Sequence, residues 1–322
     1  MMNCLTTDCG VLITFPTEMG NYRYLKPIGK GSSSVVILVE KKNSQDLYSA
    51  KLLKRDKIIN KNFERELRFL QQKVKHPNIV SVYDILYFEE TIAVIMEYCP
   101  CGDLVSELSK QGHFDLSTLR QYCYQLISAV SYLHRFGWAH RDIKSDNILI
   151  SKSGVIKLTD FGHCGEIIES DPMMSTLCGT YFYTPPEVIE EKPYDGKKCD
   201  IWSLGVVMFC MASGQLPWQQ GSETAMRERM LEGKIMDLPI INEDCMRLIK
   251  MCIVVDPNKR ATANELLDDN WFTPISLLRN HNRNKSNVLS KPLLIQKKPK
   301  VLIGRKTHLS KHAASLYHLT FS

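Results

Sequence analysis

Two short polar blocks constrain the fold and chemistry of this chain more than any other feature. The first reads His-Arg-Asp-Ile-Lys-Ser-Asp-Asn over residues 140–147, and the second, Asp-Phe-Gly, occupies residues 160–162. Together they supply a carboxylate, a lysine and two hard oxygen ligands, and Mg²⁺ takes few protein ligands because it keeps phosphates and waters. Such a set suits transfer of a phosphoryl group to a hydroxyl, which requires mainly positioning and neutralisation of charge.

Length and composition are those of a soluble globular protein. The chain has 322 residues, enough for about two domains with cores of their own. Its 44% hydrophobic and 24% charged residues are ordinary values. Charge is distributed unevenly, because ten basic residues and no acidic residue follow Asp269, which leaves 31 basic and 35 acidic residues before that point. A slightly acidic body therefore carries a basic tail.

Three observations favour a reducing compartment. The eleven cysteines are odd in number and scattered, no CxxC pair occurs, and a chain of this size needs no disulfide staples. The N-terminus lacks the basic region, apolar core and cleavage site of a signal peptide. The longest uncharged apolar run, Ile201 to Ala212, has twelve residues and is too short to span a bilayer. We expect a soluble protein, cytoplasmic or nuclear, with no transmembrane segment.

The first part of the chain favours strands. Residues 1–21 show no sustained period and are expected to form an irregular leader. β-Branched and aromatic residues then recur in four candidate strands, at 35–39, 47–53, 79–88 and 91–98. One helix interrupts them, because apolar residues at 63, 67, 70 and 74 form a single helical face.

The remainder favours helices. Apolar residues between Leu116 and Phe136 recur at helical spacing, and the runs 148–150 and 155–158, separated by Ser-Lys-Ser-Gly, predict a hairpin. Further helices are expected at 199–213, 223–232, 242–253 and 262–269. The fold class is therefore α+β, a small β-rich lobe followed by a larger α-rich lobe.

A glycine-rich segment and a lysine lie in the β-rich part. The segment 29–36 reads Gly-Lys-Gly-Ser-Ser-Ser-Val-Val, and its glycines let the backbone approach phosphate oxygens, although a flexible hairpin turn explains them equally well when taken alone. It opens no helix, and the chain lacks the G-x-x-x-x-G-K-[ST] pattern, which disfavours dinucleotide and P-loop sites. Lys51 stands in an apolar strand, so its ammonium group needs a partner, and Glu66 on the following helix is the natural candidate.

In order and spacing these features resemble those of a eukaryotic-type protein kinase: a Gly-rich loop, a strand lysine, HRD…N, DFG and an APE-like triplet. The resemblance covers Tyr22 to Phe272. Within the family, the chain most resembles the calmodulin-dependent and AMP-activated group of serine/threonine kinases. It implies a two-lobed kinase domain at 22–272, with an N-lobe at 22–96 that carries one regulatory helix and a helical C-lobe at 97–272. The basic segment 273–322 would be a flexible tail.

The resemblance also implies catalytic roles. Asp142 would act as the base toward a serine or threonine hydroxyl of a protein substrate, Lys144 would neutralise the transferring phosphoryl group, and Asn147 with Asp160 would hold Mg²⁺. Thr184 would bridge the base and the lysine.

ATP would bind between the lobes. The residues expected to contact it are Gly29, Lys30, Gly31, Ser32, Ser33, Ser34, Val36, Ala50, Lys51, Met96, Glu97, Cys99, Asp103, Asn147 and Asp160. Asp103 would also cap the next helix. Ser34 replaces the third glycine of the loop, and Ser33 replaces an aromatic residue often found at its tip.

Regulation and scaffolding follow from neighbouring residues. Arg141 could pair with a phosphate placed on Thr176 by an upstream kinase, although Gly165 stands where relatives often carry a basic partner. Glu187 is expected to pair with Arg260. Asp200 would hold the backbone of the catalytic loop.

Three matters stay open in the sequence. The tail favours a solvated segment first, contact with acidic partners or membranes second, and an autoinhibitory helix last, because Pro292 and Pro299 interrupt it. Asp103 and Asp146 favour substrates with basic residues before the acceptor hydroxyl, and no specific nucleic-acid partner is indicated. A catalytically silent kinase-like scaffold is the alternative function, and a small-molecule kinase is disfavoured by the peptide-platform segment 179–187.

Overall fold

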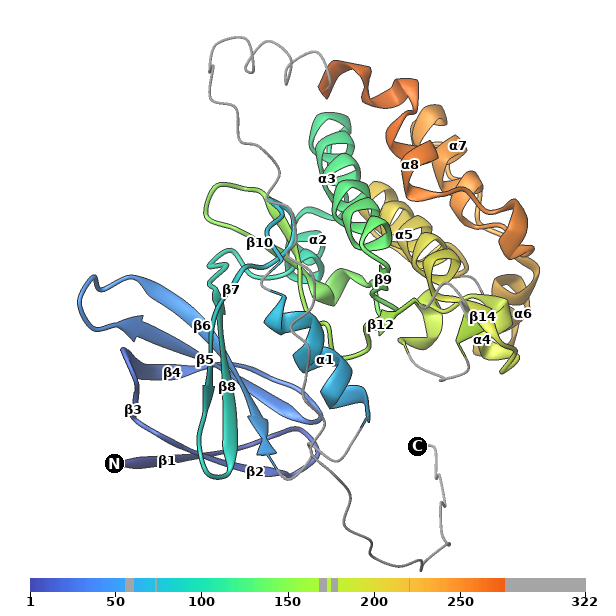
Figure 1. The fold of residues 1–322 in the computed structure, drawn as a ribbon. Helices are drawn as coiled ribbons and strands as arrows, with labels where there is room; N and C mark the ends of the chain where they lie inside the picture. Colours follow the sequence, from blue (N-terminus) through green and yellow to red (C-terminus); the bar gives the residue numbers. More distant parts are fainter. Residues whose placement is uncertain (56–60, 73, 168–172, 175–178, 220, 276–322) are drawn as a thin grey trace, which may run out of the picture. The chain divides into compact units, whose positions relative to one another are not determined.

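The computed structural model describes residues 1–55, 61–72, 74–167, 173–174, 179–219 and 221–275. Within them a strand-rich lobe precedes a helical one, as Figure 1 shows. The expected α+β, two-lobed fold is confirmed.

The N-terminal lobe is built on one antiparallel sheet in the order β3-β4-β5-β6-β8-β7. Its strands are β3 (Glu18–Met19), β4 (Tyr22–Lys30), β5 (Ser34–Lys41), β6 (Leu47–Lys54), β7 (Val82–Tyr87) and β8 (Thr91–Glu97). Side chains alternate between its two faces. On β8, Ile92 and Val94 join the core that includes Phe69 of helix α1 (Lys61–Gln71), whereas Ala93 and Ile95 join a second core.

The second core corrects the expectation of an irregular leader at 1–21. Strands β1 (Met2–Thr6) and β2 (Leu12–Pro16) form an antiparallel hairpin, and β2 packs against β6 and β8. Ile13 and Phe15 of β2 are fully buried there. An isolated hairpin is marginally stable in water, so this one depends on the apolar sheet face that it covers.

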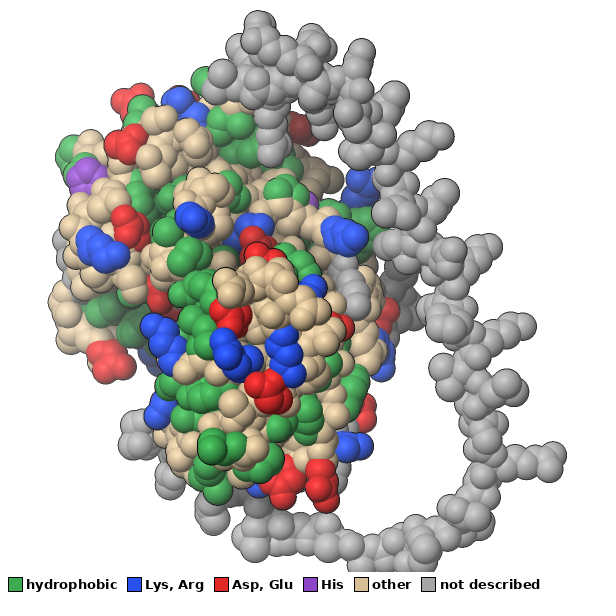
Figure 2. Space-filling model, turned by 90° about the vertical axis from the view of Figure 1, so that its left-hand side faces the viewer, with side chains coloured by type: hydrophobic (Ala, Val, Ile, Leu, Met, Phe, Trp, Pro, Cys, Tyr) green, Lys and Arg blue, Asp and Glu red, His purple; other side chains and the backbone are tan. Residues whose placement is uncertain are grey.

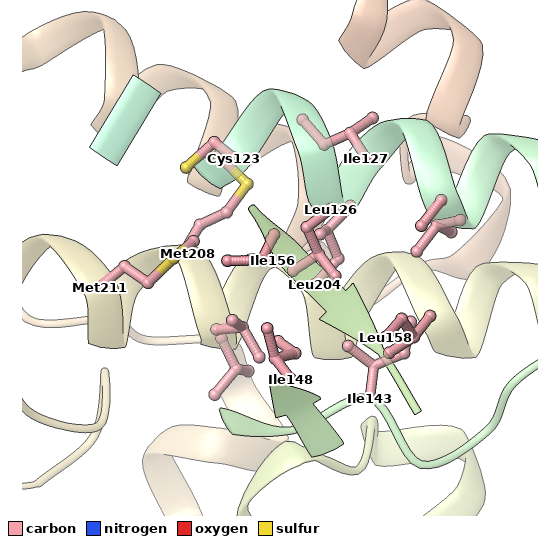
Figure 3. Packing of buried hydrophobic residues seen from close by; sticks show 14 of the residues in the cluster. Cys123, Leu126, Ile127, Ile143, Ile148, Ile156, Leu158, Leu204, Met208 and Met211 are labelled. Atoms are coloured by element: carbon pink, nitrogen blue, oxygen red, sulfur yellow. The ribbon is translucent and has the colours of Figure 1, made fainter. Parts of the chain in front are cut away.

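The C-terminal lobe is a helical assembly around one core. Its helices are α2 (Leu104–Gln111), α3 (Leu116–Arg135), α4 (Pro186–Ile189), α5 (Gly196–Ser213), α6 (Glu223–Glu232), α7 (Glu243–Cys252) and α8 (Ala263–Leu267). Leu126 of α3 points toward Leu204 of α5, with Ile156 beside them, as Figure 3 shows. Helix α5 is buried on nearly every side, which explains its apolar sequence.

Short strand pairs shape the loops between the lobes. The predicted hairpin is confirmed as β10 (Ile148–Ile150) paired with β11 (Ile156–Leu158). Two further pairs join β9 (Trp138–Ala139) to β12 (Gly165–Glu166) and β13 (Met173–Met174) to β14 (Tyr194–Asp195). The β10–β11 hairpin lies between the polar blocks 140–147 and 160–162 in sequence, and the β9–β12 pair flanks them, so these two pairs bring the blocks close together.

The surface is mixed in character. Figure 2 shows basic and acidic side chains interspersed among apolar and uncharged atoms on one face. Nowhere in the described part of the chain is a helix both long and apolar enough to cross a membrane.

Candidate active site

A cleft of about 740 Å³ gathers residues from the glycine-rich turn, β6, α1, the segment after β8 and both polar blocks. Twelve predicted nucleotide-site residues line it: Gly29, Lys30, Gly31, Ser34, Val36, Lys51, Met96, Glu97, Cys99, Asp103, Asn147 and Asp160. Ser32, Ser33 and Ala50 are not among its lining residues.

The prediction for Ala50 was wrong because strand side chains alternate. Lys51 and Ser49 face the cleft, so Ala50 between them points to the opposite face, where it is fully buried with Ile37 and Ile95. Ser49 is therefore a cleft residue that the sequence prediction missed. Counting two positions back from Lys51 along the strand would have found it.

Lys51 lies between two carboxylates at the back of the cleft. Its Nζ is 2.6 Å from Glu66 Oε1 and 2.9 Å from Asp160 Oδ1. Burial alone would lower the pKa of Lys51, but the charges of Asp160 and Glu66 outweigh burial and raise it well above its usual range. The ion pair expected between Lys51 and Glu66 is thus present, and Asp160 joins it.

Asp160 is held in an unusual backbone conformation. Its φ of +59° lies in the left-handed region that residues other than glycine seldom adopt. The Gly162 amide donates to Asp160 Oδ1 at 3.3 Å, and the positive charge of Lys51 lowers the pKa of Asp160 well below its usual range. The carboxylate therefore stays ionised and points into the cleft.

Asp200 of α5 holds the backbone at the start of the polar segment 140–147. The amides of His140 and Arg141 donate to its two carboxylate oxygens at 2.8 and 2.7 Å. Asp200 is fully buried, so these bonds tie the loop to the most deeply buried helix of the lobe. The scaffold role predicted for Asp200 matches this geometry.

Asp142 lies within a polar cluster whose other members, Lys144 and Asn147, line the cleft. Asn147 Nδ2 donates to its backbone oxygen at 2.8 Å and to its Oδ2 at 3.0 Å, and Lys144 Nζ lies 3.0 Å from the same Oδ2. These contacts fix the direction of the carboxylate.

Thr180, and not Thr184, bridges Asp142 and Lys144. Thr180 Oγ1 accepts from Lys144 Nζ at 2.7 Å and donates to Asp142 Oδ1 at 3.1 Å. Thr184 is buried and donates to the backbone oxygen of Thr180 at 3.0 Å. The reason is Gly179, whose φ of +104° and missing side chain let the chain pass where a Cβ would lie 3.0 Å from the Arg141 carbonyl oxygen.

The oxygen donors of the site fit a hard cation. Because the Asn147 amide nitrogen is used by Asp142, its Oδ1 is the atom left to face a cation, and Asp160 adds an ionised carboxylate. Among the described residues, no three His, Cys, Asp or Glu side chains group into a metal site. A cation held by Asn147 and Asp160 would thus complete its shell with phosphate and water oxygens, as Mg²⁺ does.

The segment after β8 lines the outer cleft. Glu97 is anchored by Lys157 Nζ at 2.8 Å, and Cys99 is buried, which raises the pKa of its thiol to about 12. Asp103 lines the cleft and also caps α2, since its Oδ1 accepts from the Ser106 amide at 2.7 Å. Both expectations for Asp103 are compatible with this position.

The structure bears differently on the expected pairing of Arg141 with a phosphate on Thr176 and on the expected Glu187–Arg260 ion pair. Thr176 lies outside the described residues. Arg141 is buried, and its guanidinium donates to the His163 carbonyl at 2.7 Å and to Tyr194 Oη at 3.3 Å. The expected pair of Glu187 with Arg260 is present, with bonds of 2.8 and 3.2 Å.

The two-lobed fold, the Lys51–Glu66 pair and the Asp142 cluster together define a protein kinase. Residues 22–272 match the family described as protein kinase domain, and the chain belongs to that family.

Curated relatives agree with this assignment. The chain is 33% identical over 266 residues to serine/threonine-protein kinase SIK2 of Gallus gallus, an alignment that covers 82% of this chain and 33% of the relative. It is 33% identical over 259 residues to serine/threonine-protein kinase SIK1 of Mus musculus, covering 80% of this chain and 33% of that protein. With CBL-interacting serine/threonine-protein kinase 9 of Arabidopsis thaliana it shares 31% identity over 261 residues, 80% of this chain and 58% of the relative.

These relatives confirm the resemblance to the calmodulin-dependent and AMP-activated group. The chain spans about a third of the length of the first relatives it matches.

Proposed function

We propose that this chain is an active protein serine/threonine kinase that transfers the γ-phosphoryl group of ATP to hydroxyls of protein substrates. The observation that carries the proposal is the joint presence of the Lys51–Glu66–Asp160 contacts and the Asp142–Asn147–Lys144 cluster on one cleft. Phosphoryl transfer needs charge neutralisation and alignment, and these residues provide both.

In the proposed mechanism each group has one task. Lys51, held by Glu66, contacts nucleotide phosphates, and the backbone of Glu97 and Cys99 receives the adenine edge. Asp142 Oδ1 orients the acceptor hydroxyl and takes its proton, while Lys144 neutralises charge on the phosphoryl oxygens. Mg²⁺ held by Asn147 and Asp160 would supply charge neutralisation at the phosphates when bound.

A silent kinase-like scaffold is the alternative function. Such a protein has no need to keep a strand lysine, a base and two oxygen ligands in one geometry. The strained backbone at Asp160 also argues against it, because strain of this kind costs about 1–3 kcal/mol and clusters at functional sites.

Substrate preference and regulation belong to the same proposal. Asp103 and the exposed Asp146 line the cleft and favour peptides with basic residues before the acceptor. Cys210, where some arginine-seeking relatives carry an acid, is buried and does not add to that preference. Thr176 is the proposed site for an upstream kinase. The basic segment 273–322 is proposed to meet acidic partners in the cytoplasm or nucleus, and from residue 276 onward the tail lies outside the described residues.

The test is phosphate incorporation from labelled ATP and Mg²⁺ into a mixed serine/threonine peptide library. Wild type and Asp237→Asn, an exposed control, should incorporate phosphate, and Asp142→Asn should lose it by at least about 100-fold because the base is removed. If phosphate incorporation by Asp142→Asn equals that of wild type, Asp142 is not the base. If wild type binds ATP yet transfers nothing, even after treatment with kinases that phosphorylate Thr176, the scaffold alternative is correct.

A further inference from the structure

The turn of the β1–β2 hairpin is tightly built. The Thr7 amide donates to the Val11 oxygen at 3.0 Å, the Val11 amide donates to Thr7 Oγ1 at 3.1 Å, and the Gly10 amide donates to the Thr7 oxygen at 3.0 Å. Gly10 has a φ of +75°, the left-handed conformation that closes a three-residue hairpin loop. Asp8 is therefore the second residue of a β-turn, a position that proline readily occupies.

The body of the hairpin is anchored on the outer face of the N-lobe sheet. Ile13 and Phe15 are fully buried in the second core, and the Phe15 ring meets Tyr24 edge-on with centroids 5.2 Å apart. At its edge, Thr91 Oγ1 donates to the Thr14 oxygen at 2.6 Å. Since aromatic and aliphatic burial of this kind is strong, the hairpin is a fixed part of the lobe (Figure 1).

The turn touches the glycine-rich loop. The Asp8 amide donates to the Gly31 carbonyl oxygen at 3.1 Å, and the Gly31 amide in turn donates to the Ser34 oxygen at 2.9 Å. Gly31 also lines the cleft. One backbone bond thus runs from the anchored hairpin to the part of the loop that faces the nucleotide.

We propose that the β1–β2 hairpin braces the glycine-rich loop through Asp8 and so preorganises it for nucleotide phosphates. The proposal rests on the proposed function. Glycine has the largest backbone entropy to lose on ordering, so the loop at Gly29 and Gly31 would otherwise lose that freedom when the nucleotide binds. Holding Gly31 beforehand reduces the cost and raises affinity without any new contact to the ligand.

The chain offers a matched pair of variants. Asp8→Pro removes the donating N–H but suits the turn, whereas Asp8→Ala changes the side chain and keeps the N–H. Asp8→Pro should raise the KM for ATP about 2- to 12-fold, the range expected for one lost backbone hydrogen bond, with kcat unchanged and the melting temperature lowered by no more than about 6 °C. Asp8→Ala should match wild type in all three.

Hydrogen exchange of the amides in residues 29–34 gives a second readout that needs no nucleotide. Exchange should speed up in Asp8→Pro and not in Asp8→Ala. If Asp8→Pro fails to fold, Thr7→Val carries the test, because it removes the acceptor of the Val11 amide and loosens the turn while leaving the Asp8 amide in place.

Equal ATP KM and equal loop exchange in Asp8→Pro and Asp8→Ala would overturn the brace. A wild-type protein that binds no ATP would overturn the proposed function instead, and the exchange data would still decide whether the hairpin holds the loop.

Discussion

Replacing Thr180 by valine tests the geometry of the proposed phosphotransfer site most directly. Valine keeps the shape but removes the hydroxyl that bridges Lys144 Nζ and Asp142 Oδ1. A hydrogen bond to a charged group contributes about 1.5–3 kcal/mol. Lys144 keeps its contact with Asp142 at 3.0 Å, and its side chain is 22% exposed, so water can replace part of what is lost.

We therefore expect the Thr180→Val substitution to raise the activation barrier by the free energy of one hydrogen bond to a charged group. A barrier raised by about 1.5–3 kcal/mol lowers kcat about 10- to 150-fold. The KM for ATP should stay constant, since Thr180 is not among the residues that line the nucleotide cleft.

Thr184→Val is the comparison that decides between the two threonines. Its hydroxyl donates only to the neutral Thr180 carbonyl, a bond worth about 0.5–1.5 kcal/mol, so kcat should fall about 2- to 12-fold. Steady-state kinetics on a serine peptide, with melting temperatures for both variants, measure the difference. Thr180→Ser should recover most of the wild-type rate. If Thr184→Val reduces kcat more than Thr180→Val at equal stability, the assignment of the bridge to Thr180 is wrong.

Three further predictions concern stability. Arg260→Met should destabilise the protein by about 3–5 kcal/mol, or about 6–20 °C in melting temperature, because the buried Glu187 carboxylate loses its partner. Phe15→Ala should cost about 3–5 kcal/mol in urea denaturation, whereas a leader without packed structure would tolerate it. The hydrogen bond from Arg247 lowers the pKa of Asp269 below its ordinary 3.8, so its stabilisation is present above that value and lost as pH falls through the folded pKa. Asp269→Asn should thus reduce the unfolding free energy at pH 7, with the difference from wild type closing as the pH falls below 3.8 and through the folded pKa.

The Asp142 cluster could be predicted because its groups are close in sequence. Asp142, Lys144 and Asn147 lie within six residues, and a short hairpin returns the chain to Asp160. Lys51 was predictable for another reason: an ammonium group in an apolar strand requires a partner, and Glu66 was the carboxylate within reach.

The predictions for Thr184 and for segment 1–21 were wrong because both depend on how the chain folds in three dimensions and not on the local sequence pattern. Thr180 and Thr184 are four residues apart, and the path of the chain after Gly179, which has a positive φ, brings the Thr180 hydroxyl and not the Thr184 hydroxyl to Lys144. The strands within 1–21 are not predictable from local pattern, because their alternation is short and they are stable only against the sheet that follows in sequence. Gly10 between two five-residue runs was the available signal for the hairpin.

The segment 140–147 and the glycine-rich segment are supported by different contacts. This difference predicts which variants change stability and turnover and which change nucleotide affinity. Asp200 ties the catalytic loop to α5, a helix whose residues are buried nearly throughout, so perturbation there must lower stability and turnover together. The glycine-rich segment is supported differently, because its ends are paired in the sheet while Gly31 at its tip accepts a backbone bond from Asp8 of the hairpin. Asp8→Pro, which removes the donating amide, should therefore alter nucleotide affinity while kcat stays constant. A chain whose nucleotide loop is held by an outer hairpin can thus tune its response to ATP without altering the residues that perform the chemistry.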